Sequence, residues 1–503
     1  MARRNSIAEA KSPTDGWHPA RLIPTVGIRG QEEQERRATS CLLAVMHAVP
    51  EFGHALLKEL GAPKSTVIET FAEVRFKDDA GKTVIPDGAI VCERGGRRWT
   101  ILVEVKTAKA PVNAEQVGTY LDIARENGFD GVLTISNQIT ASSSDSPVTV
   151  DGRKLKRTSL WHFSWWRIIT EAIVQSRYRG VSDPDQAWLL GELIAYFDSE
   201  ASGTGGFQDM GDRWVPVRKA AHDGTLRAGD SDAQVIAERW EEFAQYLCLG
   251  LSQDLGRSVS LPRPRKQARA ARLDELAKRL ATDGVLEATL RVPDAVGDLS
   301  VRCDLRSRQT LTSITIKAPG EGRTKARINW LLRQLSDASD DLRIEATYPN
   351  ARETTGALLG QVREDSDCLR YPADLKREPR SFTVTLSRPM GKKRGKAEGS
   401  FVRETRTQTF AFYRDLVQDL KAWQARAPKL REESASDSED DAPRPDPPPA
   451  TAVGSREPGE AEDPLAKIEH RTLDVVPGTQ ETQVDVTRSG RDGDRSIPLD
   501  DLA

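Results

Sequence analysis

Two carboxylates and a lysine near residue 100 have the types and spacing of a hydrolytic centre. Asp87 follows Pro86, and Glu104 and Lys106 belong to the strongly β-forming segment WTILVEVKT. Alternate side chains of a strand point to the same face, so Glu104 and Lys106 project together while the neighbouring valines pack on the other face. Hairpin pairing across the ERGGRR turn would bring Asp87 close to Glu104.

This set of side chains suits phosphodiester hydrolysis. Carboxylate oxygens are ligands that Mg²⁺ prefers, so the residue types of Asp87 and Glu104 suit a Mg²⁺ site. The metal neutralises charge that develops on a phosphate and helps to generate hydroxide. A lysine beside it can orient or deprotonate the attacking water and stabilise the pentacovalent state.

The alternative for these three residues is a solvated salt-bridge face on an edge strand. Charged residues make up 30% of the chain, so an ExK tripeptide alone carries little information. The position of the residues on consecutive predicted strands favours the hydrolytic site.

The segments around these residues predict a mixed α/β domain, in the order helix, three strands, helix, strand, strand, helix, helix. We expect these elements at residues 30–60, 66–76, 84–92, 99–107, 113–127, 130–137, 154–164, 165–176 and 183–197. The first helix should break at Pro50, and Asn113 and Ser164 are predicted N-caps. Because a helix joins the third and fourth strands, these strands should be parallel, in a mixed β-sheet flanked by helices.

Two motifs in this region resemble those of a known family. Pro86-Asp87 followed by Glu104-Val105-Lys106 at the end of an apolar strand resembles the PD-(D/E)xK (restriction-endonuclease-like) nuclease superfamily. The helix that follows carries Gln116 and Tyr120, which resembles the QxxxY motif of the RecB-type branch, where these residues support the site or touch nucleic acid.

The resemblance covers roughly residues 30–140 and extends at most to about residue 200. It implies a sandwich of helices around a mixed sheet and Mg²⁺-dependent hydrolysis of nucleic acid. It also implies that Asp87 and Glu104 bind Mg²⁺, for which Mn²⁺ can substitute, and that Lys106 is the catalytic lysine. Many members use a further glutamate from the N-terminal helix or first strand. Glu35, Glu69 and Glu73 compete for that role here, and parity with the hairpin favours Glu73, with Glu35 second.

Composition divides the chain into five segments with different expected roles. They are a loosely ordered arm at 1–28, the nuclease domain at 29–200, a linker at 201–224, a second α+β domain at 225–428 for substrate or partner recognition, and an acidic disordered tail at 429–503. Residues 432–503 carry a net charge of -12, which leaves +9 for the remainder. A basic body fits nucleic acid as partner, although many proteins with such an excess bind none.

Three further features have both a binding and a structural interpretation. The aromatic residues Trp161, Phe163, Trp165 and Trp166 could stack on bases, but their apolar, helically spaced neighbours favour a core. The basic run that begins at Arg263 and the loop GKKRGK at 391–396 contact phosphates in one interpretation and are solvated surface in the other.

The remaining patterns exclude several other chemistries. The chain has no HExxH or GxSxG motif, and its five cysteines are scattered singly, which disfavours a disulfide framework or a zinc site. It has no run of about 18 apolar residues and no signal-peptide pattern, so we expect a cytoplasmic protein without a membrane partner.

The sequence therefore predicts a metal-dependent nuclease that hydrolyses DNA, with endonuclease action favoured over exonuclease action. A role in restriction or antiphage defence follows from family analogy alone. The alternative is a non-catalytic nucleic-acid-binding or scaffold protein that retains the nuclease fold. RNA as substrate, and a homodimer or another protein as partner, remain open.

Overall fold

The computed structural model describes residues 21–24, 28–64, 67–77, 81–227, 229–262, 269–395 and 397–425. The predicted tail at 429–503 and most of the predicted arm at 1–28 lie outside these residues.

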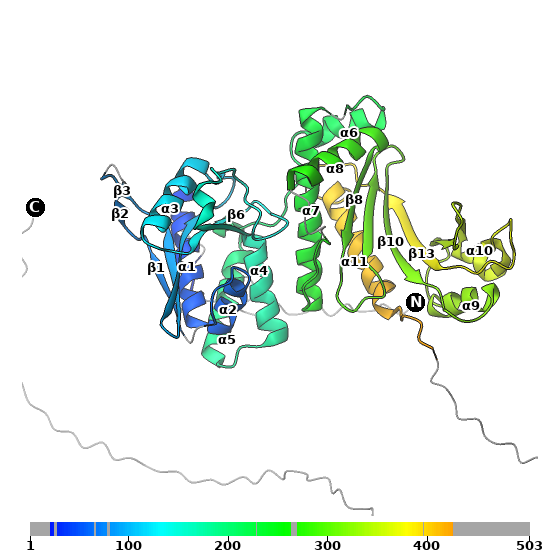
Figure 1. The fold of residues 1–503 in the computed structure, drawn as a ribbon, viewed down its shortest axis with the longest axis horizontal. Coiled ribbons are helices and arrows are strands. Elements are labelled where there is room, and N and C mark those ends of the chain that lie inside the picture. The colour runs from blue at the N-terminus through cyan, green and yellow to red at the C-terminus, as the bar shows by residue number, and fades with distance from the viewer. Residues whose placement is uncertain are drawn as a thin grey trace, which may run out of the picture. The chain divides into compact units, whose positions relative to one another are not determined.

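A five-stranded mixed sheet carries the predicted hydrolytic residues, and Figure 1 labels two of its strands, β1 and β6. In spatial order its strands are β1 (Ile68–Ala72), β4 (Gly88–Arg94), β5 (Arg97–Val105), β6 (Gly131–Ser136) and β7 (Ser159–Ser164). The pairs β1–β4 and β4–β5 are antiparallel, whereas β5–β6 and β6–β7 are parallel. The predicted mixed sheet and the predicted parallel pairing of the third and fourth strands are both confirmed.

Helices cover both faces of this sheet. One face packs against α1 (Gly30–Ala48), α2 (Pro50–Lys58), α4 (Trp165–Val174) and α5 (Pro184–Asp198), and the other against α3 (Ala114–Glu126). The predicted break at Pro50 is present, and the Asn113 side chain caps α3 by accepting hydrogen bonds from the backbone of Glu115 and Gln116. Ser164 caps α4 in the same way by accepting from Arg167.

The predicted strands differ from the structure at two places. Strand β1 ends at Ala72 because Glu73 has a left-handed φ of 50°, and a separate short ribbon follows, formed by β2 (Phe76–Lys77) and β3 (Thr83–Val84). The strand predicted at 154–164 begins only at Ser159, since Lys154–Lys156 forms a 3₁₀ turn.

A second, antiparallel sheet of six strands lies in the C-terminal half of the described chain. In sequence order its strands are β8 (Val285–Leu290), β9 (Leu299–Asp304), β10 (Gln309–Lys317), β11 (Arg343–Thr347), β12 (Thr355–Leu358) and β13 (Ser381–Pro389). The helices of this half are α6 (Trp214–His222), α7 (Ser231–Leu255), α8 (Arg269–Asp283), α9 (Thr324–Gln334), α10 (Leu359–Glu364) and α11 (Phe401–Asp415). Together they form an α+β arrangement around a large apolar core.

The segment 201–224, expected as a linker, contributes to this second core. It contains α6, whose Trp214 and Val217 are buried there, and Phe207 and Met210 join the same cluster. The chain therefore enters the second core well before residue 225.

The aromatic run at 161–166 belongs to the interior. Phe163 and Trp165 are buried in the core between the first sheet and its helices, and Trp161 and Trp166 pack against that core. The interpretation of this run as core is confirmed.

Within the described residues, no single helix is long and apolar enough to cross a membrane. Helices α1 and α2 meet that test only as a pair, bent by 106° at their junction.

Candidate functional site

The end of β5 brings Asp87, Glu104 and Lys106 together. Glu104 is 1% exposed there, on a strand that lies between β4 and β6. Asp87 immediately precedes β4, and its Oδ2 accepts a hydrogen bond of 2.7 Å from the backbone N–H of Val105. The antiparallel pairing of β4 with β5 thus places the two carboxylates at the same strand end, as the hairpin argument predicted.

Lys106 is held in place by contacts of both its side chain and its backbone. Its Nζ donates to Glu104 Oε1 at 2.5 Å and to the Val105 carbonyl at 3.1 Å. Its backbone N–H donates to the Ile135 carbonyl of β6, and its own carbonyl accepts from Trp165 Nε1 at 2.9 Å. The lysine is therefore fixed beside Glu104 rather than free to sample solvent.

The glutamate nearest to this group is Glu35 of α1, not Glu73. Glu35 Oε2 lies 3.6 Å from Lys106 Nζ, and its Oε1 accepts from the backbone N–H of Thr107 at 3.3 Å. Glu73 is instead 56% exposed and pairs with Arg36 at 3.0 Å. The structure thus reverses the order of preference between Glu73 and Glu35.

The reversal has a cause in the backbone. The parity argument for Glu73 assumes a strand that continues through residue 73, but β1 ends at Ala72. The left-handed conformation of Glu73 then breaks the alternation of side chains. Glu69, the third candidate, lies within β1 and is exposed.

Burial and mutual repulsion shape the protonation of the two carboxylates. Burial, followed by the negative charge of Asp87, raises the pKa of Glu104 to about 7. Burial also raises the pKa of Asp87, although the hydrogen bond from Val105 and the charge of Lys106 oppose this shift. Two adjacent buried carboxylates therefore favour any cation that can neutralise them.

Lys106 remains a cation in this setting. Burial alone would lower the pKa of its ammonium, but the attraction of Glu104, Glu35 and Asp87 outweighs burial and the net shift is upward. The site thus holds a permanent positive charge beside the carboxylates.

Gln116 and Tyr120 lie one turn apart on α3 and contact each other. Gln116 Nε2 donates to the Tyr120 hydroxyl at 2.8 Å, and this hydroxyl lies 3.3 Å from the carbonyl of Ile85, two residues before Asp87. Burial and the charge of Glu104 raise the pKa of the Tyr120 phenol. This pair therefore links α3 to the segment that carries Asp87.

Asn137, which the sequence analysis did not single out, ties the loops around the site together. Its Nδ2 donates to the carbonyls of Ala108 and Gly203, at 2.9 and 2.8 Å, and its Oδ1 accepts from Gly205 N–H at 2.9 Å. Asn137 could have been identified from the sequence because it directly follows the buried strand β6. This strand runs parallel to β5 and ends at the same edge of the sheet.

The two carboxylates of the site are ligands of the type that Mg²⁺ prefers. Among the described residues, no group of three or more His, Cys, Asp or Glu side chains forms a cage that could hold a metal by itself. Mg²⁺ does not require one, because it usually binds through one or two carboxylates and keeps several waters. Glu104 Oε2 is buried with no hydrogen-bond partner, so it offers an uncommitted ligand oxygen.

The described arginines of the two basic segments form ion pairs within the protein. Arg269 and Arg272, at the end of the run that begins at Arg263, both pair with Glu241. In the loop at 391–396, Arg394 pairs with Asp209 and Asp212. Residues 263–268 and Lys396 lie outside the described residues.

Comparison with known families yields no match to any family model, and a search of curated proteins finds no relative.

Proposed function

We propose that residues 29–200 form a Mg²⁺-dependent nuclease with a restriction-endonuclease-like core, which hydrolyses phosphodiester bonds in DNA. The observation that carries the proposal is the buried group at the end of β5, where Lys106 Nζ lies 2.5 Å from Glu104 Oε1 and Asp87 is hydrogen-bonded to the same strand end. Placing two carboxylates and a lysine together at a buried or half-buried position costs free energy, and such an arrangement favours a chemical role.

The roles of the residues follow from their contacts. Asp87 and Glu104 would hold Mg²⁺, which when bound supplies charge neutralisation at the phosphate and a more acidic water. Lys106, as a fixed ammonium, would stabilise negative charge on the phosphate and orient the attacking water. Glu35 holds Lys106 from the side of α1, and Gln116 and Tyr120 fix the segment before Asp87.

DNA is the favoured substrate, with endonuclease action, because of the resemblance to restriction-endonuclease-like enzymes and the basic charge of the chain before its acidic tail. A cytoplasmic setting and a role in restriction or antiphage defence belong to the same proposal and depend on family analogy.

The test is cleavage of supercoiled plasmid in Mg²⁺, Mn²⁺ or EDTA. The intact chain is compared with Asp87→Asn, Glu104→Gln and Lys106→Met. The control is Lys109→Met, which removes an exposed lysine three residues beyond Lys106. We expect nicking or linearisation that requires metal, is lost in the three site variants and persists in the control. Single-stranded DNA and RNA in parallel reactions decide the substrate class.

The alternative is a non-catalytic nucleic-acid-binding or scaffold protein, because the Lys106–Glu104 pair would also satisfy two buried charges without chemistry. Binding of DNA or RNA that survives EDTA, with no cleavage in any metal, would support the scaffold and contradict the enzyme.

A further inference from the structure

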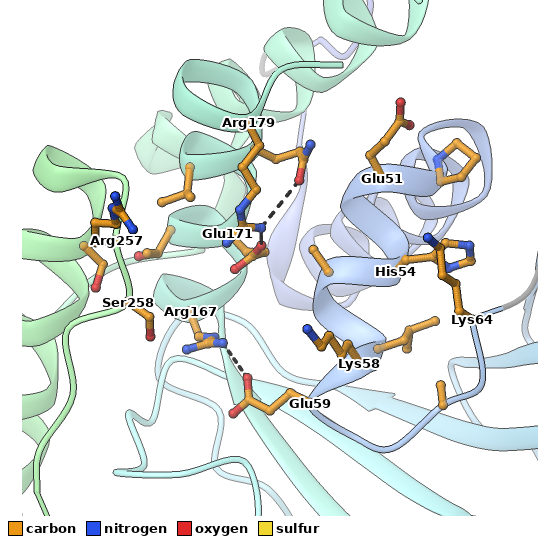
Figure 2. A pocket seen from close by; sticks show the side chains of 18 of the residues that line it. Glu51, His54, Lys58, Glu59, Lys64, Arg167, Glu171, Arg179, Arg257 and Ser258 are labelled. Carbon is orange, nitrogen blue, oxygen red and sulfur yellow. Dashed lines mark hydrogen bonds and ion pairs between the residues drawn. The ribbon is translucent and has the colours of Figure 1, made fainter. Parts of the chain in front are cut away.

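A cavity of about 970 Å³ lies between α2, α4 and the segment that follows α7 (Figure 2). None of the proposed catalytic residues lines it. Leu57, Val174 and Leu249 form apolar parts of its wall. Its size falls near the upper end of the range for small-molecule sites, roughly 300–1,000 Å³.

Five cations line this cavity, against three carboxylates, Glu51, Glu59 and Glu171. Two arginines are paired, Arg167 with Glu59 and Arg179 with Glu171, as the dashed lines in Figure 2 mark. Among the described residues, no carboxylate forms an ion pair with the three other cations that line the cavity, which are Lys58, Lys64 and Arg257. Burial, and then the charge of Lys64, lower the pKa of His54, in keeping with a positive potential at this wall.

Arg167 has hydrogen-bonding capacity that the protein does not use. Its Nε is buried and has no partner, while its NH2 group contacts Glu59. A guanidinium presents its donors as a planar fork that matches two oxygens of a phosphate or carboxylate. The Arg167 side chain is 28% exposed, so an anion in the cavity would accept hydrogen bonds from the guanidinium donors that face it.

A smaller cavity of about 520 Å³ adjoins the first and shares Arg167 and Ser258 with it. Hydroxyl groups line it, from Ser142, Ser143 and Ser164 among others. Gln245 also lines it, and its Oε1 is buried without a partner. Arg167 therefore lies at the boundary between the smaller, hydroxyl-lined cavity and the larger, partly apolar cavity.

The wall of the larger cavity contains an irregular helix. Residues Gln175–Arg179 form a π-helix, η2, directly after α4, and both Gln175 and Arg179 line the cavity. π-Helical turns are rare and occur frequently at functional sites. This irregular turn forms part of the wall of the cavity.

We propose that this cavity binds a phosphate monoester carried on an organic body, with Arg167 as the principal anion-binding side chain. Lys58, Lys64 and Arg257 attract the anion, and the aliphatic wall packs against the attached group. No Phe, Tyr or Trp side chain is among the described residues that line the larger cavity, so we expect the phosphate rather than base stacking to determine affinity. Two sources carry this chemistry: a free mononucleotide and the 5′-phosphorylated end of a nucleic-acid strand.

The test is binding of defined probes to the full chain in EDTA and low salt, measured by calorimetry. The probes are AMP, adenosine, inorganic phosphate, and one short DNA oligonucleotide with either a 5′-phosphate or a 5′-hydroxyl. We expect AMP to bind saturably and adenosine to bind at least about tenfold more weakly, because the charge-assisted hydrogen bonds are lost. A 5′-phosphorylated oligonucleotide that binds more tightly than AMP would identify a strand end as the source.

Matched variants locate the binding site. Arg167→Lys keeps the charge but loses the planar fork, and we expect about tenfold weaker binding of AMP. Arg257→Gln removes an exposed cation and leaves both ion pairs intact, so it should weaken binding even if Arg167→Lys does not fold. Arg98→Gln removes an exposed arginine outside the cavity and should change nothing.

Two outcomes would overturn the proposal. One is that AMP, phosphate and the phosphorylated oligonucleotide all fail to bind the intact chain. The other is that every folded cavity variant binds as tightly as the Arg98→Gln control. Because binding is measured without metal or cleavage, neither outcome depends on whether the chain is a nuclease.

Discussion

The carboxylate of Glu35, from the first helix, lies 3.6 Å from the ammonium of Lys106 at the end of β5, measured from Oε2 to Nζ. Both side chains are largely buried, at 16% and 17% exposure. Glu35 also accepts a hydrogen bond from the backbone of Thr107, so it fixes the lysine and the residue that follows it.

This relationship predicts that Glu35→Gln impairs nucleic-acid cleavage, whereas Glu73→Gln does not. Loss of the Glu35 charge should lower the rate by roughly tenfold or more, because Glu35 helps to position the ammonium of Lys106. Glu73 contacts Arg36 at the surface, so its replacement should change the cleavage rate by less than about twofold. Plasmid cleavage at saturating Mg²⁺ measures both rates. A larger loss of rate in Glu73→Gln would restore the sequence-based preference for Glu73, and equal losses in the two variants would contradict a special role of Glu35.

A second prediction concerns metal and stability. If Asp87 and Glu104 bind Mg²⁺ or Mn²⁺ only in the folded chain, metal at about 100 times its dissociation constant should add about 3 kcal/mol to the free energy of unfolding. Urea unfolding with and without metal measures this difference. Asp87→Asn should abolish it, and Glu69→Gln, which removes an exposed carboxylate from β1, should retain it. A metal effect that persists in Asp87→Asn would place the ion elsewhere.

A third prediction concerns pH and His162 of β7. Its Nε2 donates to the Gln138 carbonyl, and its Nδ1 lies 2.9 Å from the Thr134 hydroxyl. Complete burial lowers the pKa of the imidazole to about 4, so the folded protein holds the neutral form.

Because the folded pKa of His162 lies below that of the unfolded chain, the unfolded state gains a proton first as the pH falls. The contribution of neutral His162 to the free energy of unfolding is therefore complete above about pH 6.5. It is lost progressively as the pH falls towards 4. Between about pH 7.5 and pH 5 we expect the intact chain to lose about 2 kcal/mol relative to His162→Gln, measured by urea unfolding. Parallel pH profiles of the two proteins would contradict this expectation.

A fourth prediction concerns Asn137, which bonds three backbone groups of the loops after β5 and α5. Asn137→Ala should lower the free energy of unfolding by about 2 kcal/mol or more, because partly buried backbone groups lose their partners. Asn127→Ala, which removes a single contact to the Ile123 carbonyl at the end of α3, should cost about half as much or less. Urea unfolding of the two variants compares them directly, and equal losses would deny Asn137 its bridging role.

The sequence by itself determined the elements of the first sheet and the identity of its central charged group. The apolar run before Glu104 and the turn at 93–98 were sufficient to predict β4 and β5, because alternation and turn chemistry act locally. The parallel pairing of β5 with β6 followed from the helix that connects them. Glu104 and Lys106 share a face for the same local reason.

Only the tertiary structure decided which glutamate joins Lys106. Glu35 reaches the site through the packing of α1 against the sheet, and no local pattern encodes that contact. Glu73 was favoured by strand periodicity, but its left-handed backbone interrupts the strand, and a single residue with positive φ is not visible in a pattern of alternating side chains. The bridging role of Asn137 and the cavity around Arg167 likewise arise where segments distant in sequence meet, so periodicity alone could not predict them.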